Sequence, residues 1–221
     1  MGINVIVTGV TGMVGEGVLL ECLQNHRVDS VLAVCRKALD LSHPKLKVFV
    51  APDFLQIDGA GTQLRGYDAC FYCAGVSSNG VTEEDYTRIT YDTTLHFAAA
   101  TLQANRHIVF NFISGHLADS SEQGRVMWAR IKGKAENALL KMFAGKEYNL
   151  RPALMQPMPG QKHFYGYNRW THKILYPLLS LFFPACSIQQ IAQAMINATL
   201  MGYEKPILEV SDIRKLAARG S

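Results

Sequence analysis

Three glycines near the start of the chain have the spacing of a phosphate-binding turn. Gly9, Gly12 and Gly15 lie in TGVTGMVG, after a buried strand that the sequence predicts to end at Val7. This turn needs a tight bend, a close backbone approach to a pyrophosphate and a helix packed closely on a sheet, and glycine permits each. The first amides of the helix then face the anion. A glycine turn without a ligand is the alternative. The residues expected around the pyrophosphate are Gly9, Thr11, Gly12, Met13, Val14 and Gly15.

Two basic residues follow the second predicted strand, at the position that distinguishes the two nicotinamide dinucleotides. An NAD site usually places a carboxylate there, about 20 residues after the glycine turn, on the ribose 2′-hydroxyl. This chain has Arg36 and Lys37 instead, and the nearest acid, Asp40, lies beyond the strand. Guanidinium and ammonium groups attract a 2′-phosphate and donate hydrogen bonds to it. The sequence therefore predicts NADP(H), unless both residues are only solvated loop charges.

Residues after the third and fourth predicted strands are expected to complete the cofactor site. The Asp53 carboxylate is placed to accept a hydrogen bond from the adenine amine, and Phe54 to pack on the adenine ring. After the fourth strand, Cys73, Ala74 and Gly75 are small enough to let the cofactor pass.

The elements that must position these residues alternate between strand and helix patterns. This alternation predicts an α/β fold, with a doubly wound, mostly parallel Rossmann sheet covered by helices on both faces. Residues 1–157 are expected to form the NADP-binding domain. Residues 158–221 are expected to add a small C-terminal helical lobe, packed on that domain as one structural unit. The predicted strands are 3–7, 30–35, 47–50, 69–74, 107–113 and 148–150, and long helices are predicted over 82–105 and 121–143.

With these motifs the chain resembles the short-chain dehydrogenase/reductase superfamily, in particular its atypical and extended branch with NmrA-like and epimerase-like proteins. The resemblance implies a site that joins a Ser after the fifth strand to a Tyr-x-x-x-Lys pair on the next helix. Ser114 and Lys132 match the Ser and the Lys as catalytic residues, and Lys132 would also bind the nicotinamide ribose. The segments that carry the resemblance are TGVTGMVG, PDF at 52–54, CAG at 73–75, ISG at 113–115, RIKGKAE at 130–136 and LRPALMQP at 150–157.

The family's tyrosine position is occupied by Trp128, one helical turn before Lys132. An indole N–H donates a hydrogen bond but cannot act as an acid or base. Tyr165 and Tyr167, or His116 beside Ser114, are the candidate replacements, although the tyrosines could only pack and His116 could be an ordinary loop residue. Arg151 is expected to order the loop after the sixth strand rather than to contact substrate.

Composition indicates a globular, cytoplasmic protein. The chain has 221 residues, 48% of them hydrophobic, and a net charge of +4, which is too mild to indicate nucleic-acid binding. The start of the chain lacks the pattern of a signal peptide. Five cysteines suggest reduced thiols. Cys70 and Cys73 form a CxxC, but three positions along a strand point them to opposite faces, so no metal site is expected.

Partners are constrained only broadly by the sequence. The longest apolar run, residues 174–184, is too short to span a membrane, and a core helix is favoured over an interfacial contact. The helices predicted over 82–105 and 121–143 could form a homodimer interface or pack on the sheet of a monomer. The substrate is a small molecule that no motif identifies.

Two functions remain open. The first is an NADP(H)-dependent oxidoreductase or isomerase acting on a small carbonyl compound or sugar derivative, in which the protein positions the reactants. The second is a regulatory protein that senses NADP(H) without turnover, as in some NmrA-like proteins. The fold alone cannot choose between them.

Overall fold

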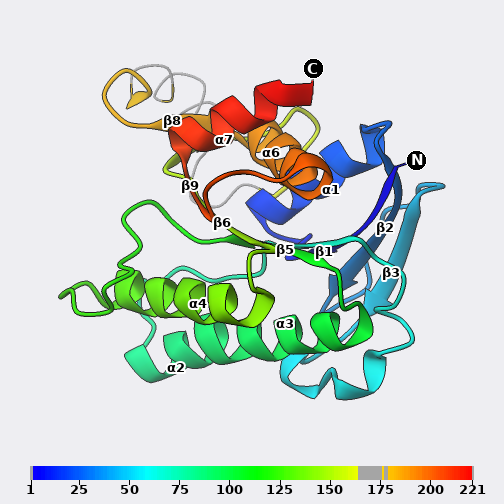
Figure 1. Ribbon diagram of the computed structural model, residues 1–221, viewed down its shortest axis with the longest axis horizontal. Coiled ribbons are helices and arrows are strands. Elements are labelled where there is room, and N and C mark those ends of the chain that lie inside the picture. The colour runs from blue at the N-terminus through cyan, green and yellow to red at the C-terminus, as the bar shows by residue number, and fades with distance from the viewer. Residues whose placement is uncertain (1, 164–175, 177–178, 221) are drawn as a thin grey trace.

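A seven-stranded parallel sheet organises the molecule. The computed structural model describes residues 2–163, 176 and 179–220 (Figure 1). The strand order is β3-β2-β1-β4-β5-β6-β9, and every neighbouring pair is parallel. The predicted Rossmann sheet is therefore confirmed. Its strands are β1 (Ile3–Thr8), β2 (Val28–Cys35), β3 (Leu46–Val50), β4 (Ala69–Tyr72), β5 (Val109–Ile113), β6 (Glu147–Arg151) and β9 (Ile207–Glu209).

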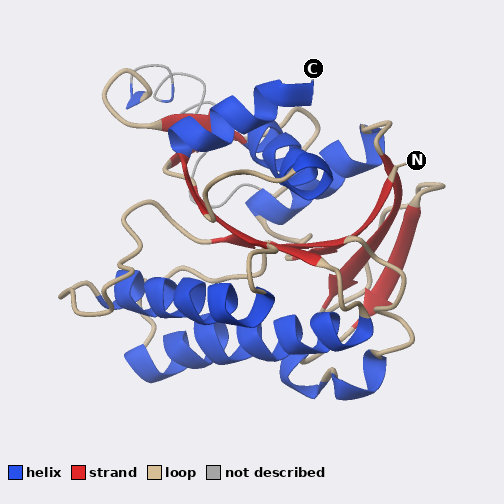
Figure 2. Ribbon diagram, viewed as in Figure 1, coloured by secondary structure: helices blue, strands red, loops and turns tan. Residues whose placement is uncertain are grey.

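Helices cover both faces of this sheet, as Figure 2 shows. One face carries α1 (Met13–Gln24), α6 (Ile188–Met201) and α7 (Val210–Ala217), and the other carries α2 (Glu83–Thr87), α3 (Thr93–Ala104) and α4 (Met127–Phe143). A separate hydrophobic cluster fills each interface between sheet and helices. Cys70 is buried in the cluster under α3 and α4, whereas Cys73 packs against the other cluster. The prediction that these two sulfurs lie on opposite sides is confirmed.

The predicted helix over 82–105 is present, with one irregular turn. Thr82 caps it by accepting a hydrogen bond from the Asp85 amide, and acids occupy its first turn, where the helix dipole favours them. Residues Arg88–Asp92 between α2 and α3 are wound as a π-helix. Such wider turns are frequent at functional sites, and this one faces the cavity described below.

The predicted helix over 121–143 begins too early. Residues before Val126 form a loop, and α4 starts at Met127. The Asp119 carboxylate organises this loop by accepting hydrogen bonds from the Ser121 and Gly124 amides. These bonds and one from the Ser121 hydroxyl lower the pKa of Asp119. Local side-chain-to-backbone bonds of this kind compete with helix formation, which explains the later start.

The C-terminal residues complete the sheet as well as covering it. The helical lobe predicted after residue 158 contains α6 and α7, and Ser187 and Gln190 form a capping box at the start of α6. Strand β9, which the sequence did not predict, pairs with β6 in the main sheet. A small second sheet joins β7 (Leu154–Gln156) to β8 (Ala185–Ser187). Within the described part of the chain, no helix is both long and apolar enough to cross a membrane.

Candidate functional site

A cavity of about 390 Å³ opens where the carboxyl ends of β1, β2 and β4 meet. The strand order reverses direction between β1 and β4, and ligands of open α/β sheets bind at such a switch point. Most of the cofactor residues predicted from the sequence come together here. Those that line the cavity are Gly9, Thr11, Gly12, Arg36, Asp53, Phe54, Cys73, Ala74 and Gly75.

The glycine turn is shaped by close backbone contacts. Gly9 has φ +67°, and a Cβ built on it would lie 2.5 Å from the Cys73 carbonyl oxygen. The Gly12 amide donates to the Gly9 carbonyl at 2.8 Å, which closes the turn. A Cβ on Gly15 would lie 2.2 Å from the same Gly9 oxygen. Glycine is therefore required at positions 9 and 15 to bring α1 against the ends of β1 and β4.

The N-terminus of α1 is suited to hold an anion. Gly12 is its N-cap residue and provides no side-chain hydrogen bond to the first amides of the helix. An uncapped helix start beside a cavity leaves donors and a positive dipole end for a phosphate. Met13 and Val14 are partly buried against the core under α1, and these two residues lie outside the cavity lining, as does Gly15. Of the residues expected around the pyrophosphate, the lining of the cavity therefore includes Gly9, Thr11 and Gly12.

Two guanidinium groups line the cavity. Arg36 follows β2 as predicted, whereas Lys37 lies outside the lining. Arg88, which the sequence analysis missed, enters from the π-helical turn. It is an exposed residue, 3.9 Å from the Asp85 carboxylate. Arg88 is the first residue of that turn, and no local sequence pattern signals that it lines a cavity at the carboxyl edge of the sheet.

The predicted adenine contacts are only partly in place. The Asp53 carboxylate lines the cavity, but it caps a short 3-10 helix by accepting a hydrogen bond from the Leu55 amide at 2.9 Å. Phe54 is among the residues that line the cavity, while its ring packs against Phe97 with centroids 4.9 Å apart. Phe54 therefore belongs mainly to the core, because its 7% exposure leaves little ring surface for a base.

Thr8 joins the two strands that flank the cavity, a role that the sequence analysis did not assign. Its buried hydroxyl accepts hydrogen bonds from the Cys73 and Ala74 amides at 3.1 and 3.2 Å. The floor of the cavity is thus fixed by one side chain at the end of β1.

The residues that match the family's catalytic positions lie between β5 and α4. Lys132 Nζ donates hydrogen bonds to the carbonyl oxygens of Ile113 and Ser114 at 3.2 and 2.9 Å. A Cβ built on Gly115 would lie 3.6 Å from Trp128 Cζ3 and 3.7 Å from Lys132 Cδ, so both side chains pack over the turn after β5. Trp128 and Lys132 therefore lie side by side over this turn, with an indole where the resemblance leads us to expect a phenol.

Burial changes the chemistry of two groups in this region. It lowers the pKa of Lys132 to about 8, although the nearby Glu136 carboxylate acts in the opposite direction. Ser114 is only 5% exposed, and its Oγ has no hydrogen-bond partner among the described residues. A buried hydroxyl without a partner is unusual, because buried polar groups are normally satisfied.

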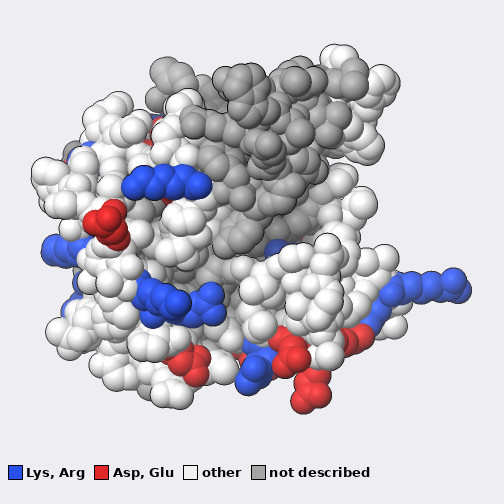
Figure 3. Space-filling view, turned by 180° about the vertical axis from the view of Figure 1, so that it is seen from behind, with Lys and Arg blue, Asp and Glu red and all other residues white. Residues whose placement is uncertain are grey.

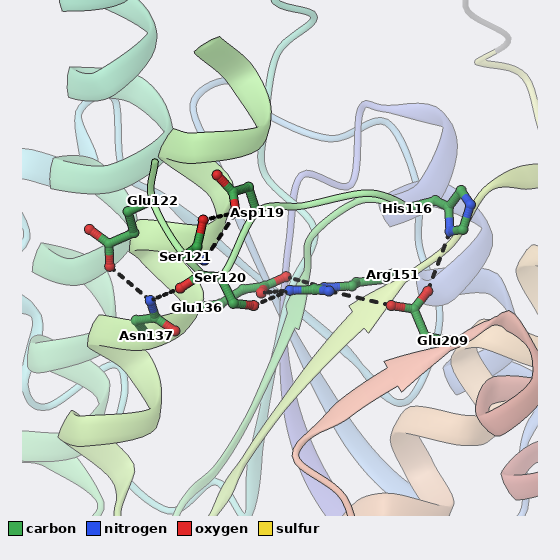
Figure 4. Close-up of polar contacts among 9 residues, drawn as sticks. All are labelled: His116, Asp119, Ser120, Ser121, Glu122, Glu136, Asn137, Arg151 and Glu209. Atoms are coloured by element: carbon green, nitrogen blue, oxygen red, sulfur yellow. Dashed lines mark hydrogen bonds and ion pairs between the residues drawn. The ribbon is translucent and has the colours of Figure 1, made fainter. Parts of the chain in front are cut away.

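A chain of polar contacts runs from α4 across the sheet to the loop after β5 (Figure 4). Arg151, at the end of β6, pairs with the fully buried Glu136 of α4 and with Glu209 at the end of β9. Glu209 also contacts His116 Nδ1 at 3.3 Å. Arg151 thus joins β6 to α4 and β9, and its side chain also donates to Ser120 Oγ in the loop after β5, so these contacts do not test the predicted role in ordering the loop after β6.

His116 borders two further cavities. One, of about 720 Å³, is also lined by Gln156, Glu209 and Arg214, and the other, of about 470 Å³, by Trp128. Tyr165 and Tyr167, the alternative proton donors proposed from the sequence, lie outside the described residues.

On the face seen in Figure 3, basic and acidic side chains are interspersed.

Comparisons with known proteins identify the fold. No protein-family model matches the chain. A relative in sequence is the leucinostatins biosynthesis cluster protein T of Purpureocillium lilacinum, 25% identical over 233 aligned positions that cover 87% of this chain and 83% of that protein.

Solved structures resemble the whole chain. The Bordetella bronchiseptica enzyme WbmF, in complex with NAD+, matches with a TM-score of 0.68 and 17% identity over 98% of this chain and 77% of its own. A short-chain dehydrogenase from Burkholderia cenocepacia, in complex with NADP, gives 0.69 and 15% over 99% and 94%. ADP-L-glycero-D-manno-heptose-6-epimerase of Helicobacter pylori gives 0.70 and 14% over 99% and 81%. The chain therefore has the Rossmann fold of NAD(P)-dependent epimerases and short-chain dehydrogenases/reductases.

Proposed function

We propose that this protein is an NADP(H)-dependent oxidoreductase or isomerase that acts on a small carbonyl compound or sugar derivative. The observation that carries the proposal is the cavity at the switch point of the sheet, where the glycine turn, the uncapped start of α1 and Arg36 converge. A dinucleotide would place its pyrophosphate at the glycine turn and its nicotinamide toward β5 and α4.

The preference for NADP(H) over NAD(H) rests on charge at the end of β2. Arg36 and Arg88 both line the cavity, so two guanidinium groups are available for a 2′-phosphate. The carboxylate that lines it, Asp53, is already engaged by the Leu55 amide and by Gln56 Nε2 at 3.4 Å. A ribose 2′-hydroxyl would find no carboxylate next to Cys35, where an NAD site usually provides one.

Turnover is supported by the arrangement after β5. A bound dihydronicotinamide supplies a hydride, and the chain must orient the acceptor carbonyl and provide a proton. Lys132 lies within reach of the turn at Ser114 and can bind a ribose hydroxyl once it exchanges its carbonyl partners. The unpartnered Ser114 hydroxyl is the kind of group that a substrate oxygen would satisfy.

The experiment is a fluorescence assay of NADPH consumption against a panel of small aldehydes, ketones and keto sugars. We expect consumption with at least one compound, and a decrease of about tenfold or more in kcat/KM for Lys132→Ala. Lys141→Ala, in the last turn of the same helix, is the matched control and should retain full activity. NADPH oxidation that is unaffected by Lys132→Ala would contradict the role given to Lys132.

The alternative function is an NADP(H) sensor. It is favoured by a single observation, the indole of Trp128 at the position where the family has its phenol. Tight NADPH binding with no consumption across the whole panel would support the sensor and reject the enzyme.

A further inference from the structure

We infer that His116 is the proton donor that replaces the missing tyrosine, and that Glu209 is the residue that orients it. This inference rests on the proposed function, because it supplies the acid that the reduction of a carbonyl requires. It is carried by the position of His116 between two cavities and by a chain of contacts that fixes its ring.

His116 lies where a substrate on either side would meet it. Its side chain is 36% exposed and lines both the 720 Å³ cavity and the 470 Å³ cavity. The second of these is also lined by Trp128, so His116 faces the space where the family's phenol would act. The His116 amide donates a hydrogen bond to the Pro152 carbonyl at 3.0 Å, which holds its backbone at the carboxyl edge of the sheet.

Glu209 determines which ring nitrogen faces the cavities. An ionised carboxylate can only accept hydrogen bonds, so His116 Nδ1, 3.3 Å from Glu209 Oε2, must carry its proton. The contacts of the described residues leave Nε2 without a hydrogen-bond partner. This is the arrangement in which a carboxylate fixes one nitrogen of an imidazole and the other exchanges a proton with a substrate.

Glu209 is itself held in place from two directions. Arg151 Nη1 lies 3.4 Å from Glu209 Oε1, and Arg151 is anchored by the buried carboxylate of Glu136 (Figure 4). Glu209 also caps α7, where its carboxylate accepts from the Asp212 amide. A side chain fixed by an ion pair and a helix cap loses little further entropy when it positions His116.

The proton transfer balances with NADPH as the reductant. Hydride adds to the carbonyl carbon, the π electrons of the C=O bond move to oxygen, and the His116 ring, protonated on both nitrogens at this step, loses its Nε2 proton to that oxygen as the N–H bond breaks. The carbonyl is reduced to an alcohol and the cofactor is oxidised. The imidazole is left neutral, with its Nδ1 proton still donated to Glu209, and regains a proton from solvent.

The first test measures NADPH-dependent reduction of 9,10-phenanthrenequinone and methylglyoxal. We expect His116→Ala to lower kcat about 100-fold or more while NADPH affinity is retained. Free imidazole should restore part of the lost activity, because the two cavities leave room for it beside residue 116. If His116 had only a structural role, free imidazole would not restore the activity of the His116→Ala variant.

The control is His107→Ala, which removes a histidine just before β5, whereas His116 lies just after that strand. His107 is exposed and contacts Lys146 Nζ at 3.1 Å, so its loss should change kcat by less than about twofold. Glu209→Gln keeps a hydrogen-bond acceptor for the cap of α7 but removes the charge, and it should lower kcat about tenfold or more with little change in KM.

The second test needs no substrate. Long-range ¹H–¹⁵N spectra of the protein alone should show the neutral His116 ring protonated at Nδ1, and a mixture of both tautomers in Glu209→Gln. Wild-type activity together with a His116→Ala variant within about twofold of it would overturn this inference and leave the proposed function intact. Wild-type protein that binds NADPH but consumes none with any carbonyl compound would contradict the proposed function, and the inference with it.

Discussion

Burial shifts the pKa values of single residues in this molecule far from the values usual for their residue types. Lys132 illustrates this, because removal from water lowers the pKa of its ammonium to about 8. Its i+4 neighbour Glu136 is fully buried, yet that carboxylate is neutralised by Arg151 rather than by Lys132. The Lys132 ammonium instead donates its hydrogen bonds to the carbonyl oxygens of Ile113 and Ser114.

Glu147 gives a prediction about stability and pH. Burial, reinforced by the Glu136 charge, raises the pKa of Glu147 from 4.5 to about 9, and neither oxygen has a hydrogen-bond partner among the described residues. Between these two values the unfolded chain releases the proton that the folded chain retains. The free energy of unfolding of the wild type therefore decreases as pH rises through this window.

We expect Glu147→Gln to remove this pH-dependent loss, since an amide does not ionise. Its free energy of unfolding should exceed that of the wild type by roughly 1–3 kcal/mol at pH 8 and by less at pH 5. Urea denaturation at both values measures this. Glu84→Gln, on an exposed turn, is the control, and an equal effect of Glu147→Gln at both pH values would contradict the account.

One physical reason explains why some residues with a structural role could not be identified from the sequence. Thr8, Arg88 and Glu147 take part only through neighbours that are distant in sequence: Thr8 binds amides after β4, and Arg88 reaches the cavity through a π-turn. Gly9 and Arg36 were identifiable because strand, turn and helix follow one another locally. Local order can be predicted from a sequence, whereas partners across the sheet cannot.

The turn between β1 and α1 depends on the close approach of the Gly9 backbone to the backbone of Cys73, and the variant Gly9→Ala tests this dependence. Its φ of +67° is strained for any other residue, and the new Cβ would lie 2.5 Å from the Cys73 carbonyl oxygen. We expect a loss of roughly 1–3 kcal/mol in the free energy of unfolding, together with weaker NADPH binding. Gly61→Ala is the matched control, because its φ is −55° and nothing lies within 4 Å. A neutral Gly9→Ala variant would refute the tight-turn geometry.

The ion pair between Arg151 and Glu136 connects α4 to the edge of the sheet. Arg151→Met would leave the Glu136 carboxylate buried without its partner, and we expect a loss of about 3–5 kcal/mol. The double variant Glu136→Gln, Arg151→Met should recover much of that loss, because no charge remains to be compensated. Thermal denaturation of both variants gives the comparison, and equal losses would show that packing rather than charge is responsible.

Prediction at the level of elements succeeded where local signals were strong. The helix predicted over 82–105 begins beside a cap at Thr82, and α6 in the predicted C-terminal lobe begins with the box formed by Ser187 and Gln190. It failed at the start of α4, where Asp119 organises the preceding loop, and at β9, whose three residues gain their strand character only by pairing with β6. Short strands at the edge of a sheet carry too few residues for a periodic pattern.

The seven-stranded sheet that organises the molecule is built from strands near both ends of the chain. Strand β1 lies inside this sheet between β2 and β4, and β9 lies at one edge, and the helices that follow them, α1 and α7, cover the same face (Figure 1). A ligand at the carboxyl edge therefore contacts elements distributed along most of the chain. Saturating NADPH should raise the melting temperature of the entire molecule in one transition.

The central claim is a dinucleotide with a 2′-phosphate bound beside Arg36, and calorimetric titration of wild-type protein with NADPH and NADH at one salt concentration tests it most directly. We expect NADPH to bind at least about tenfold more tightly than NADH. The variant Arg36→Ala should lower the affinity for NADPH by about tenfold to a hundredfold and leave the affinity for NADH little changed. Arg65→Ala, an exposed residue before β4, should change neither affinity. Equal or tighter binding of NADH, or no heat with either dinucleotide, would contradict the claim.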